Sequence, residues 1–209
     1  MAKITALRLG KGRSKQANVS LDGKSAFSLE AEVALREGLK VGQELSAGQI
    51  EALIKANHFK RCLDAAARYL SYRPRSEYEM RRQLSKHHFD DDCIEAVLSK
   101  LKGQGLVDDS AFARFWKDNR QSFSPRSQWL TRLELKQKGV SSEIIDQVVS
   151  TIDDADNAYR VATGRAHSLK MSDYHSFRHR LGEYLRRRGF NYGVISRTIE
   201  RLWQEREAL

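Results

Sequence analysis

Residues 84–101 read LSKHHFDDDCIEAVLSKL, and the same apolar pattern returns in residues 135–152 and again in residues 185–202. In the second copy every corresponding position is apolar, and in the third copy only Thr198 departs from the pattern. A pattern that recurs three times at an almost constant interval predicts tandem repeats, each of them one structural unit. The positions that define the pattern in the first copy are Leu84, Phe89, Ile94, Val97, Leu98 and Leu101.

The spacing within each copy predicts helices. Apolar residues at i, i+1, i+4, i+5 and i+8 form one stripe along a helix, as in the stretch from Cys93 to Leu101. Another helix, which carries Leu84 or its equivalents, precedes this one across a short turn. Gly139 and Gly189 in that turn suit a left-handed helix end, whereas His88 departs from the glycine pattern. We expect a further helix at the start of each copy, at residues 65–73, 110–120 and 155–166.

These features predict a mainly α fold of three tandem three-helix, helix-turn-helix-like repeats, which present an elongated surface. Asp22-Gly23, between alternating segments around Val19 and Phe27, is a strong hairpin signal. A strand at residues 4–9, a helix at 28–36 and a helix that starts at Ser46 complete a small N-terminal segment containing the β-hairpin. The expected divisions are an N-terminal segment at 1–60 and repeats at 61–108, 109–154 and 155–209.

The net positive charge of the chain favours an anionic partner. The chain has 209 residues, of which 37 are Lys or Arg and 27 are Asp or Glu, so its formal net charge is +10. The excess lies at the two ends, with +4 in residues 1–60 and +5 in residues 155–209. Two cysteines, no secretory leader pattern and no long apolar run point to a cytosolic protein that crosses no membrane.

Motifs for catalysis or for cofactors are missing from the sequence. It contains no Gly-rich phosphate loop, no HExxH and no paired CxxC, so an enzyme is the weakest hypothesis and no cofactor is expected. His175 and His179 have zinc-ligand spacing, but Asp173 is the only further candidate ligand nearby, so we expect a solvated or core role for them and no metal site. The acidic runs at residues 90–92, 108–109 and 153–154 fit helix N-termini. Cys62 and Cys93 stand among apolar neighbours, as inert thiols do.

Basic residues are therefore the candidate contacts with a partner. Guanidinium groups at a helix end can bind phosphates, but a solvated surface is an equally good interpretation of each cluster. Arg75 and Arg126 occupy matching positions in two Pro-Arg-Ser junctions, where each could simply cover its own repeat. The candidates, with the strongest first, are Arg186, Arg187, Arg188, Arg75, Arg126, Arg178, Arg180, Lys11, Arg13 and Lys15.

Several of these stretches also resemble a known family. Arg75-Ser76, Gly105-Leu106-Val107-Asp108-Asp109 and Leu185-Arg186-Arg187-Arg188-Gly189-Phe190 are similar to the repeat signatures of RecX, the family of bacterial regulators of the RecA recombinase. The similarity is strong over residues 61–203, and it extends to the N-terminal hairpin of longer members. His88 in place of glycine and a third repeat without the Pro-Arg-Ser junction are departures from the family pattern.

This resemblance implies that the three repeats form an elongated curved rod. It also implies a non-enzymatic modulator that binds RecA and the RecA nucleoprotein filament. Family members inhibit strand exchange, ATP hydrolysis and co-protease activity, and thereby regulate DNA repair and the SOS response. We expect such a regulator to act as a monomer. The alternative is a sequence-nonspecific protein that binds single- or double-stranded DNA directly through its basic third repeat, with a steep salt dependence.

Overall fold

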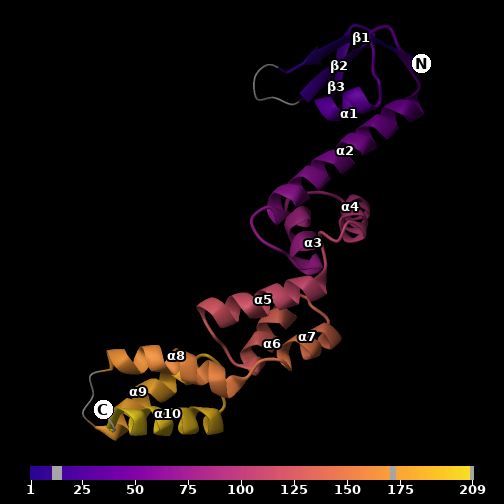
Figure 1. Cartoon of the computed structure of the whole chain (residues 1–209). Coiled ribbons are helices and arrows are strands. Elements are labelled where there is room, and N and C mark those ends of the chain that lie inside the picture. The colour runs from indigo at the N-terminus through magenta and orange to yellow at the C-terminus, as the bar shows by residue number, and fades with distance from the viewer. Residues whose placement is uncertain (11–15, 170–172, 208–209) are drawn as a thin grey trace. The chain divides into compact units, whose positions relative to one another are not determined.

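The computed structural model describes residues 1–10, 16–169 and 173–207. The described chain is mainly helical, with a small sheet near its N-terminus (Figure 1). It forms two compact units, of which the first comprises Met1–Arg73 and Met80–Leu106 and the second Pro74–Glu79 and Val107–Leu209. None of the described helices has the length and apolar character needed to cross a membrane.

The first unit begins with an antiparallel sheet in the order β3-β2-β1-β4. Asp22 and Gly23 both have positive φ, of 47° and 78°, so they form the expected tight turn between β2 and β3. Residues 28–30, expected to be helical, instead extend β3, because Ser28 and Glu30 pair with β2. The strands are β1 (Ala2–Leu9), β2 (Gln16–Leu21), β3 (Lys24–Glu30) and β4 (Glu44–Leu45).

Helices cover the sheet and continue into the first repeat. Helix α1 (Ala31–Arg36) is followed by α2 (Ala47–Leu70). Ser46 and Gln49 form a reciprocal capping box at the start of α2. The helix expected at residues 65–73 therefore begins much earlier, at Ala47, because no proline interrupts the chain before Pro74. Residue 60 lies inside α2, so the N-terminal segment and the first repeat share this helix. Helices α3 (Glu77–Lys86) and α4 (Asp91–Gly103) complete that repeat.

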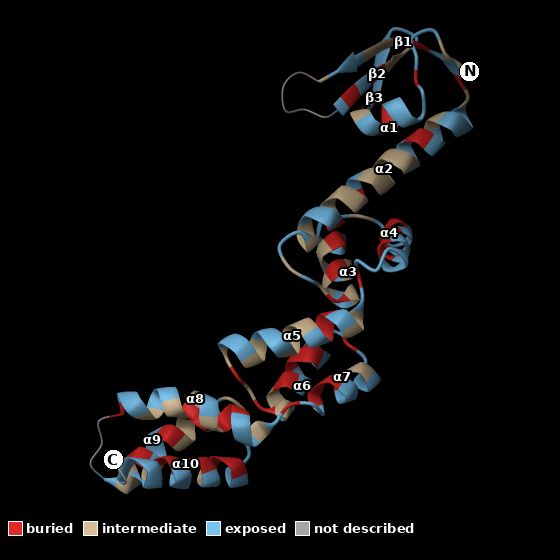
Figure 2. Cartoon of the chain, viewed as in Figure 1, coloured by how far each residue is buried: buried red, intermediate tan, exposed pale blue. Residues whose placement is uncertain are grey.

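The second and third repeats follow the same plan. The second contains α5 (Asp109–Phe123), α6 (Gln128–Gln137) and α7 (Ser142–Val149), and the third contains α8 (Asp154–Ser168), α9 (Tyr174–Arg186) and α10 (Tyr192–Glu207). Apart from the half-buried Phe89, every position of the repeated apolar pattern is buried, including Thr198. Each of these two repeats has its own core on the faces that its helices turn toward one another (Figure 2). The helical repeats expected from the sequence are confirmed.

The turn before the last helix of each repeat has the same backbone in all three copies. His88, Gly139 and Gly189 have φ of 61°, 75° and 82°, and in each copy the next residue donates its N–H to the carbonyl of Leu84, Leu135 or Leu185. This is the hydrogen-bonding pattern of a Schellman helix end. His88 therefore adopts the glycine-like conformation, and its side chain is exposed.

The two glycine turns are also crowded. A Cβ on Gly139 would lie 2.4 Å from the Cβ of Tyr78, and one on Gly189 would lie 2.6 Å from the Oγ of Ser127. Both neighbours belong to a helix start in the preceding repeat. Glycine is thus required at these two turns for space as well as for backbone conformation.

The acidic runs act as expected at helix starts. Asp90, Asp108 and Asp153 are the N-caps of α4, α5 and α8, and the carboxylate of each accepts backbone N–H groups of the first turn. The carboxylate of Asp90, for example, accepts the N–H of Cys93 at 2.8 Å. These contacts give the carboxylates a structural role without a bound cation.

Candidate functional site

The candidate site lies on the third repeat, where α9 and α10 border a groove of about 300 Å³. Cationic side chains from α9 and the exposed ring of Tyr192 from α10 line it, above a floor that includes Gly182 and Ile199. The buried side chains of Phe177, Leu181 and Leu185 hold α9 against the core, which turns its polar face outward. The basic residues that line the groove are His175, Arg178, His179 and Arg186.

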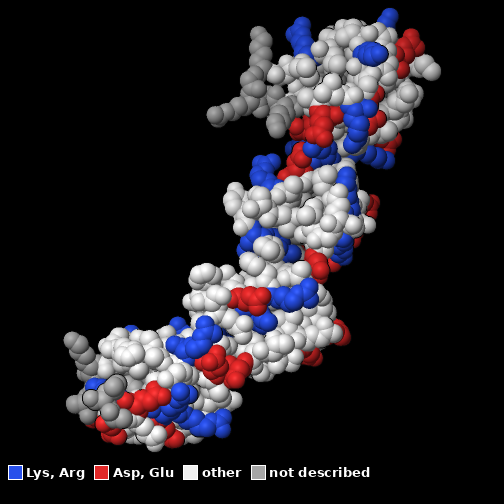
Figure 3. Space-filling model, in the orientation of Figure 1, with Lys and Arg blue, Asp and Glu red and all other residues white. Residues whose placement is uncertain are grey.

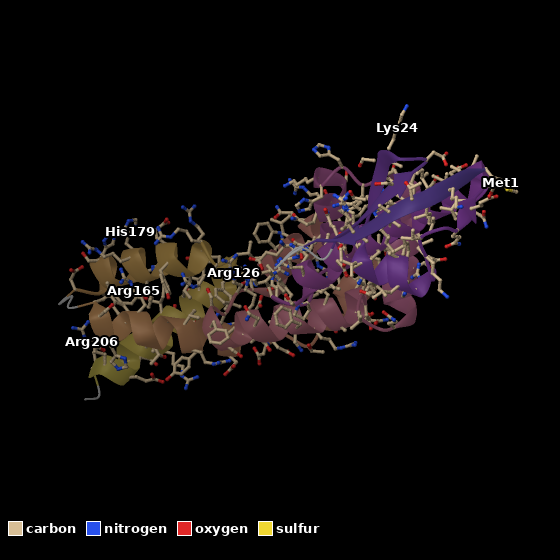
Figure 4. All side chains as sticks on the ribbon, turned by 90° about the horizontal axis from the view of Figure 1, so that it is seen from above. Met1, Lys24, Arg126, Arg165, His179 and Arg206 are labelled. Carbon is tan, nitrogen blue, oxygen red and sulfur yellow. The ribbon has the colours of Figure 1, made fainter. Side chains whose placement is uncertain are left out.

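Arg178 and Arg180 are both exposed on α9, but only Arg178 lines the groove. The guanidinium of Arg178 donates a hydrogen bond to the hydroxyl oxygen of Tyr192 at 2.8 Å, which joins α9 to α10 across the groove. This bond leaves further N–H groups of the guanidinium for an anion. His179 lies at the outer edge of the repeat in Figure 4, on the side opposite to Arg206.

The three consecutive arginines at the end of α9 differ in their surroundings. Arg186 and Arg187 are exposed, and Arg186 pairs with Glu183 at 2.9 Å through a side chain that is 72% exposed. Arg188 is half-buried, with its guanidinium 3.8 Å from the centre of the Tyr184 ring, and its backbone carbonyl accepts the N–H of Ser127. Arg186 and Arg187 are thus available to a partner, whereas Arg188 packs against its own repeat.

Arg126 is not part of this surface. Its guanidinium pairs with Glu134, a carboxylate that also accepts hydrogen bonds from the Nε1 of Trp116 at 2.7 Å and the Nε of Arg120 at 2.9 Å. The side chain of Glu134 is only 11% exposed. Arg126 therefore neutralises a buried carboxylate within the second repeat, which is the structural interpretation of this residue.

The remaining candidates do not extend the surface on the third repeat. Arg75 is half-buried at the matching junction. Lys11, Arg13 and Lys15 lie outside the described residues. The visible face of the molecule in Figure 3 carries acidic and basic groups side by side on the third repeat, so its basic groups do not form one continuous patch there.

Metal or thiol chemistry has no support in the described part of the chain. Its His, Cys, Asp and Glu residues form no group of three that could hold a metal ion. Cys62 and Cys93 are buried free cysteines. Burial raises the pKa of Cys62 to about 12 and also raises the pKa of Cys93, so both thiols stay protonated at neutral pH. Protonated, buried thiols are poor nucleophiles.

Two features of this site escaped the sequence analysis. His175 and His179 were not expected to belong to a binding surface, yet both line the groove beside Arg178. Their spacing of four residues, continued to Arg178 and Gly182 on α9, was the available signal for one helical face. Glu134 gave no signal at all, because a single glutamate in a helix is ordinarily a surface residue.

The helices and these exposed cations define a class: a tandem three-helix repeat protein with a cation-lined groove in its last repeat. Family models for the first and the second three-helix domain of RecX match residues 62–101 and 108–149. The chain belongs to the RecX family.

Curated relatives and solved structures agree with this assignment. The regulatory protein RecX of Clostridium beijerinckii is 28% identical over 208 residues, which cover 97% of this chain and 96% of the relative. That of Bacillus licheniformis is 29% identical over 203 residues, covering 96% and 77%. A crystal structure of regulatory protein RecX superposes with a TM-score of 0.68 at 26% identity, covering 94% of this chain and 98% of the other.

Proposed function

We propose that this chain is a non-enzymatic regulator that binds the RecA recombinase and its nucleoprotein filament and inhibits recombination, ATP hydrolysis and co-protease activity. The observation that carries the proposal is the similarity to regulatory proteins named RecX over almost the whole chain. A filament of recombinase on DNA presents phosphates and acidic side chains, and a cationic surface complements both.

Within this proposal, the third repeat supplies the contacts with the anionic partner. Arg178, Arg180, Arg186 and Arg187 are exposed there, and the groove beside them also contains the ring of Tyr192. Guanidinium groups can donate paired hydrogen bonds to phosphate or carboxylate oxygens, and an exposed tyrosine ring can stack on a base. The same arrangement favours a second candidate function, direct binding to DNA without recombinase.

The test is RecA ATP hydrolysis on single-stranded DNA, with this protein added at substoichiometric amounts and at two salt concentrations. Inhibition at a small ratio of protein to RecA is the expected result, because one molecule bound at a filament end can stop the growth of that filament. Inhibition that requires enough protein to cover the DNA, and that disappears at the higher salt concentration, would instead support direct DNA binding.

A variant with four substitutions tests whether the third repeat provides the contact surface. Replacement of Arg178, Arg180, Arg186 and Arg187 by Ala is expected to weaken inhibition at least tenfold, because each lost charged hydrogen bond contributes about 1.5 kcal/mol or more. The control replaces Arg114 and Lys136, two exposed cations of the second repeat, by Ala. Equal inhibition by the four-residue variant and the control would remove the third repeat from the proposal.

A further inference from the structure

The groove on the third repeat contains two ionisable side chains that the proposed function does not use. His175 and His179 are exposed on α9 and line the groove together with Arg178. Arg178 and His179 follow His175 by three and four residues, which places the three side chains on one face of the helix. Histidine ordinarily changes its charge between pH 5 and 8, so the charge of this face changes in the same range.

The remaining groups of the groove leave a small positive excess at neutral pH. Glu183 is the only carboxylate among the described residues that line the groove, and it pairs with Arg186 at 2.9 Å. From α10, Tyr192 and Ser196 contribute uncharged hydroxyl groups, and that of Tyr192 accepts a hydrogen bond from Arg178 at 2.8 Å. Two arginines and one carboxylate leave one positive charge, and protonation of both histidines raises it to three.

One further carboxylate lies at the start of α9. Asp173 is the N-cap of this helix, and its carboxylate accepts the N–H of Ser176 at 2.8 Å. The hydrogen bonds from Ser176, and to a smaller extent the charge of His175, lower the pKa of Asp173. Asp173 does not line the groove, so its carboxylate does not take the place of an anion there.

Protonation of the two histidines and binding of an anion favour each other. Two imidazolium groups beside the guanidinium of Arg178 repel it and one another, and an anion bound among the three cations offsets this repulsion. By linkage, the factor by which the anion favours protonation equals the factor by which protonation favours the anion. Two added charges about 5 Å from the anion strengthen its binding about tenfold in a water-like dielectric.

We infer that His175 and His179 are anion ligands of this groove, which binds a phosphate group more tightly as the pH falls. The inference rests on the proposed function, for which it names a pH dependence. A phosphate suits the groove because its oxygens can accept the N–H groups of both imidazoles and of Arg178. A carboxylate has only two oxygens for these three donors. The exposed ring of Tyr192 can stack on a base attached to the phosphate.

The test follows the ring signals of all six histidines of the full chain by NMR spectroscopy between pH 5 and 8, with and without sulfate. Sulfate is the probe because it is tetrahedral like phosphate and keeps a constant charge over this range, and sodium chloride holds the ionic strength constant. The titration midpoints of His175 and His179 are expected to rise by about half a pH unit each, which together correspond to tenfold tighter binding. The internal controls, whose midpoints are expected to stay unchanged, are His58, His87, His88 and His167.

A double variant tests the same coupling from the side of the protein. Replacement of His175 and His179 by Gln keeps polar side chains in the helix but removes both ionisable groups. The parent is expected to bind sulfate about tenfold more tightly at pH 5 than at pH 8, and the variant equally at both. The control replaces the exposed His87 and His167 by Gln and is expected to behave like the parent. Circular dichroism checks that both variants keep the helical content of the parent.

Three outcomes overturn the inference. Unchanged midpoints of His175 and His179 would mean that neither binds a tetrahedral anion, and equal shifts of all six histidines would mean a general effect of the salt. A double variant with the pH dependence of the parent would mean that other groups take up the protons. None of these measurements contains RecA, so the proposed function stands or fails separately, on the inhibition of RecA ATP hydrolysis.

Discussion

The second and third repeats have the same three helices and the same crowded glycine turn, but they use their cations differently. In the second repeat, Arg120 and Arg126 converge on Glu134, and Lys138 pairs with Glu79 at 2.5 Å. In the third repeat, Arg186 and Arg187 project from the end of α9 into solvent. The comparison shows that a count of basic residues does not locate a binding surface, because a buried carboxylate such as Glu134 can engage two arginines of its own repeat.

The glycine turn that the two repeats share gives the largest expected effect on stability. Gly189→Ala is expected to destabilise the protein by about 3 kcal/mol, because the new methyl group adds left-handed backbone strain to a steric overlap. That methyl group would lie 2.7 Å from the Cβ of Leu130 as well as close to Ser127. The measurement is the midpoint of urea denaturation followed by circular dichroism.

Gly164→Ala in α8 is the control for this substitution. A Cβ at Gly164 meets no neighbouring atom within 4 Å, and alanine favours a helix more than glycine does, so this variant is expected to be slightly more stable than the parent. Equal effects of the two substitutions would show that the turn at Gly189 is not crowded in solution.

The buried carboxylate gives the next largest effect and separates the two repeats. Glu134→Ala is expected to cost about 2 kcal/mol, because it leaves two partly buried guanidinium groups and the indole N–H of Trp116 without their acceptor. The change for comparison in the third repeat is Glu183→Ala, which removes an exposed pair with Arg186 and is expected to cost less than about 0.5 kcal/mol. Urea denaturation of both variants measures the difference, and similar losses would contradict it.

The equivalent turn of the first repeat, at His88, gives the smallest expected effect on stability. His88→Gly is expected to stabilise the protein by about 0.5 kcal/mol, since the relief of left-handed strain at φ 61° exceeds the entropy that glycine gains in the unfolded chain. No gain in thermal denaturation, or a loss, would mean that contacts of the imidazole ring compensate for the strain.

The repeat architecture could be predicted because the sequence of each repeat contains the apolar residues of its own core. The positions equivalent to Leu84, Ile94 and Leu101 recur three times, and such periodicity depends on local helix geometry alone. The start of α2 was predicted, but its length was not. No proline lies between Ser46 and the expected helix at 65–73, so the sequence contains no signal that divides this stretch in two at residue 60. Pro74 marks only its far end.

The candidate site could be predicted only in part, because side-chain direction depends on tertiary packing. Arg186 and Arg188 are two residues apart in one basic run, yet the first is exposed and the second packs on Tyr184. The sequence suggested both roles for Arg126 and could not choose between them without the position of Glu134.

The most direct test of this account is the inhibition of RecA ATP hydrolysis on single-stranded DNA by two double variants. One replaces Arg186 and Arg187 by Ala, and the other replaces Arg114 and Lys136 by Ala, where Lys136 is the repeat equivalent of Arg186. The account predicts that the first variant needs at least tenfold more protein for half inhibition, whereas the second inhibits like the parent. Unchanged inhibition by the first variant, or an equal loss of inhibition in both variants, would contradict the claim that the third repeat binds the anionic partner.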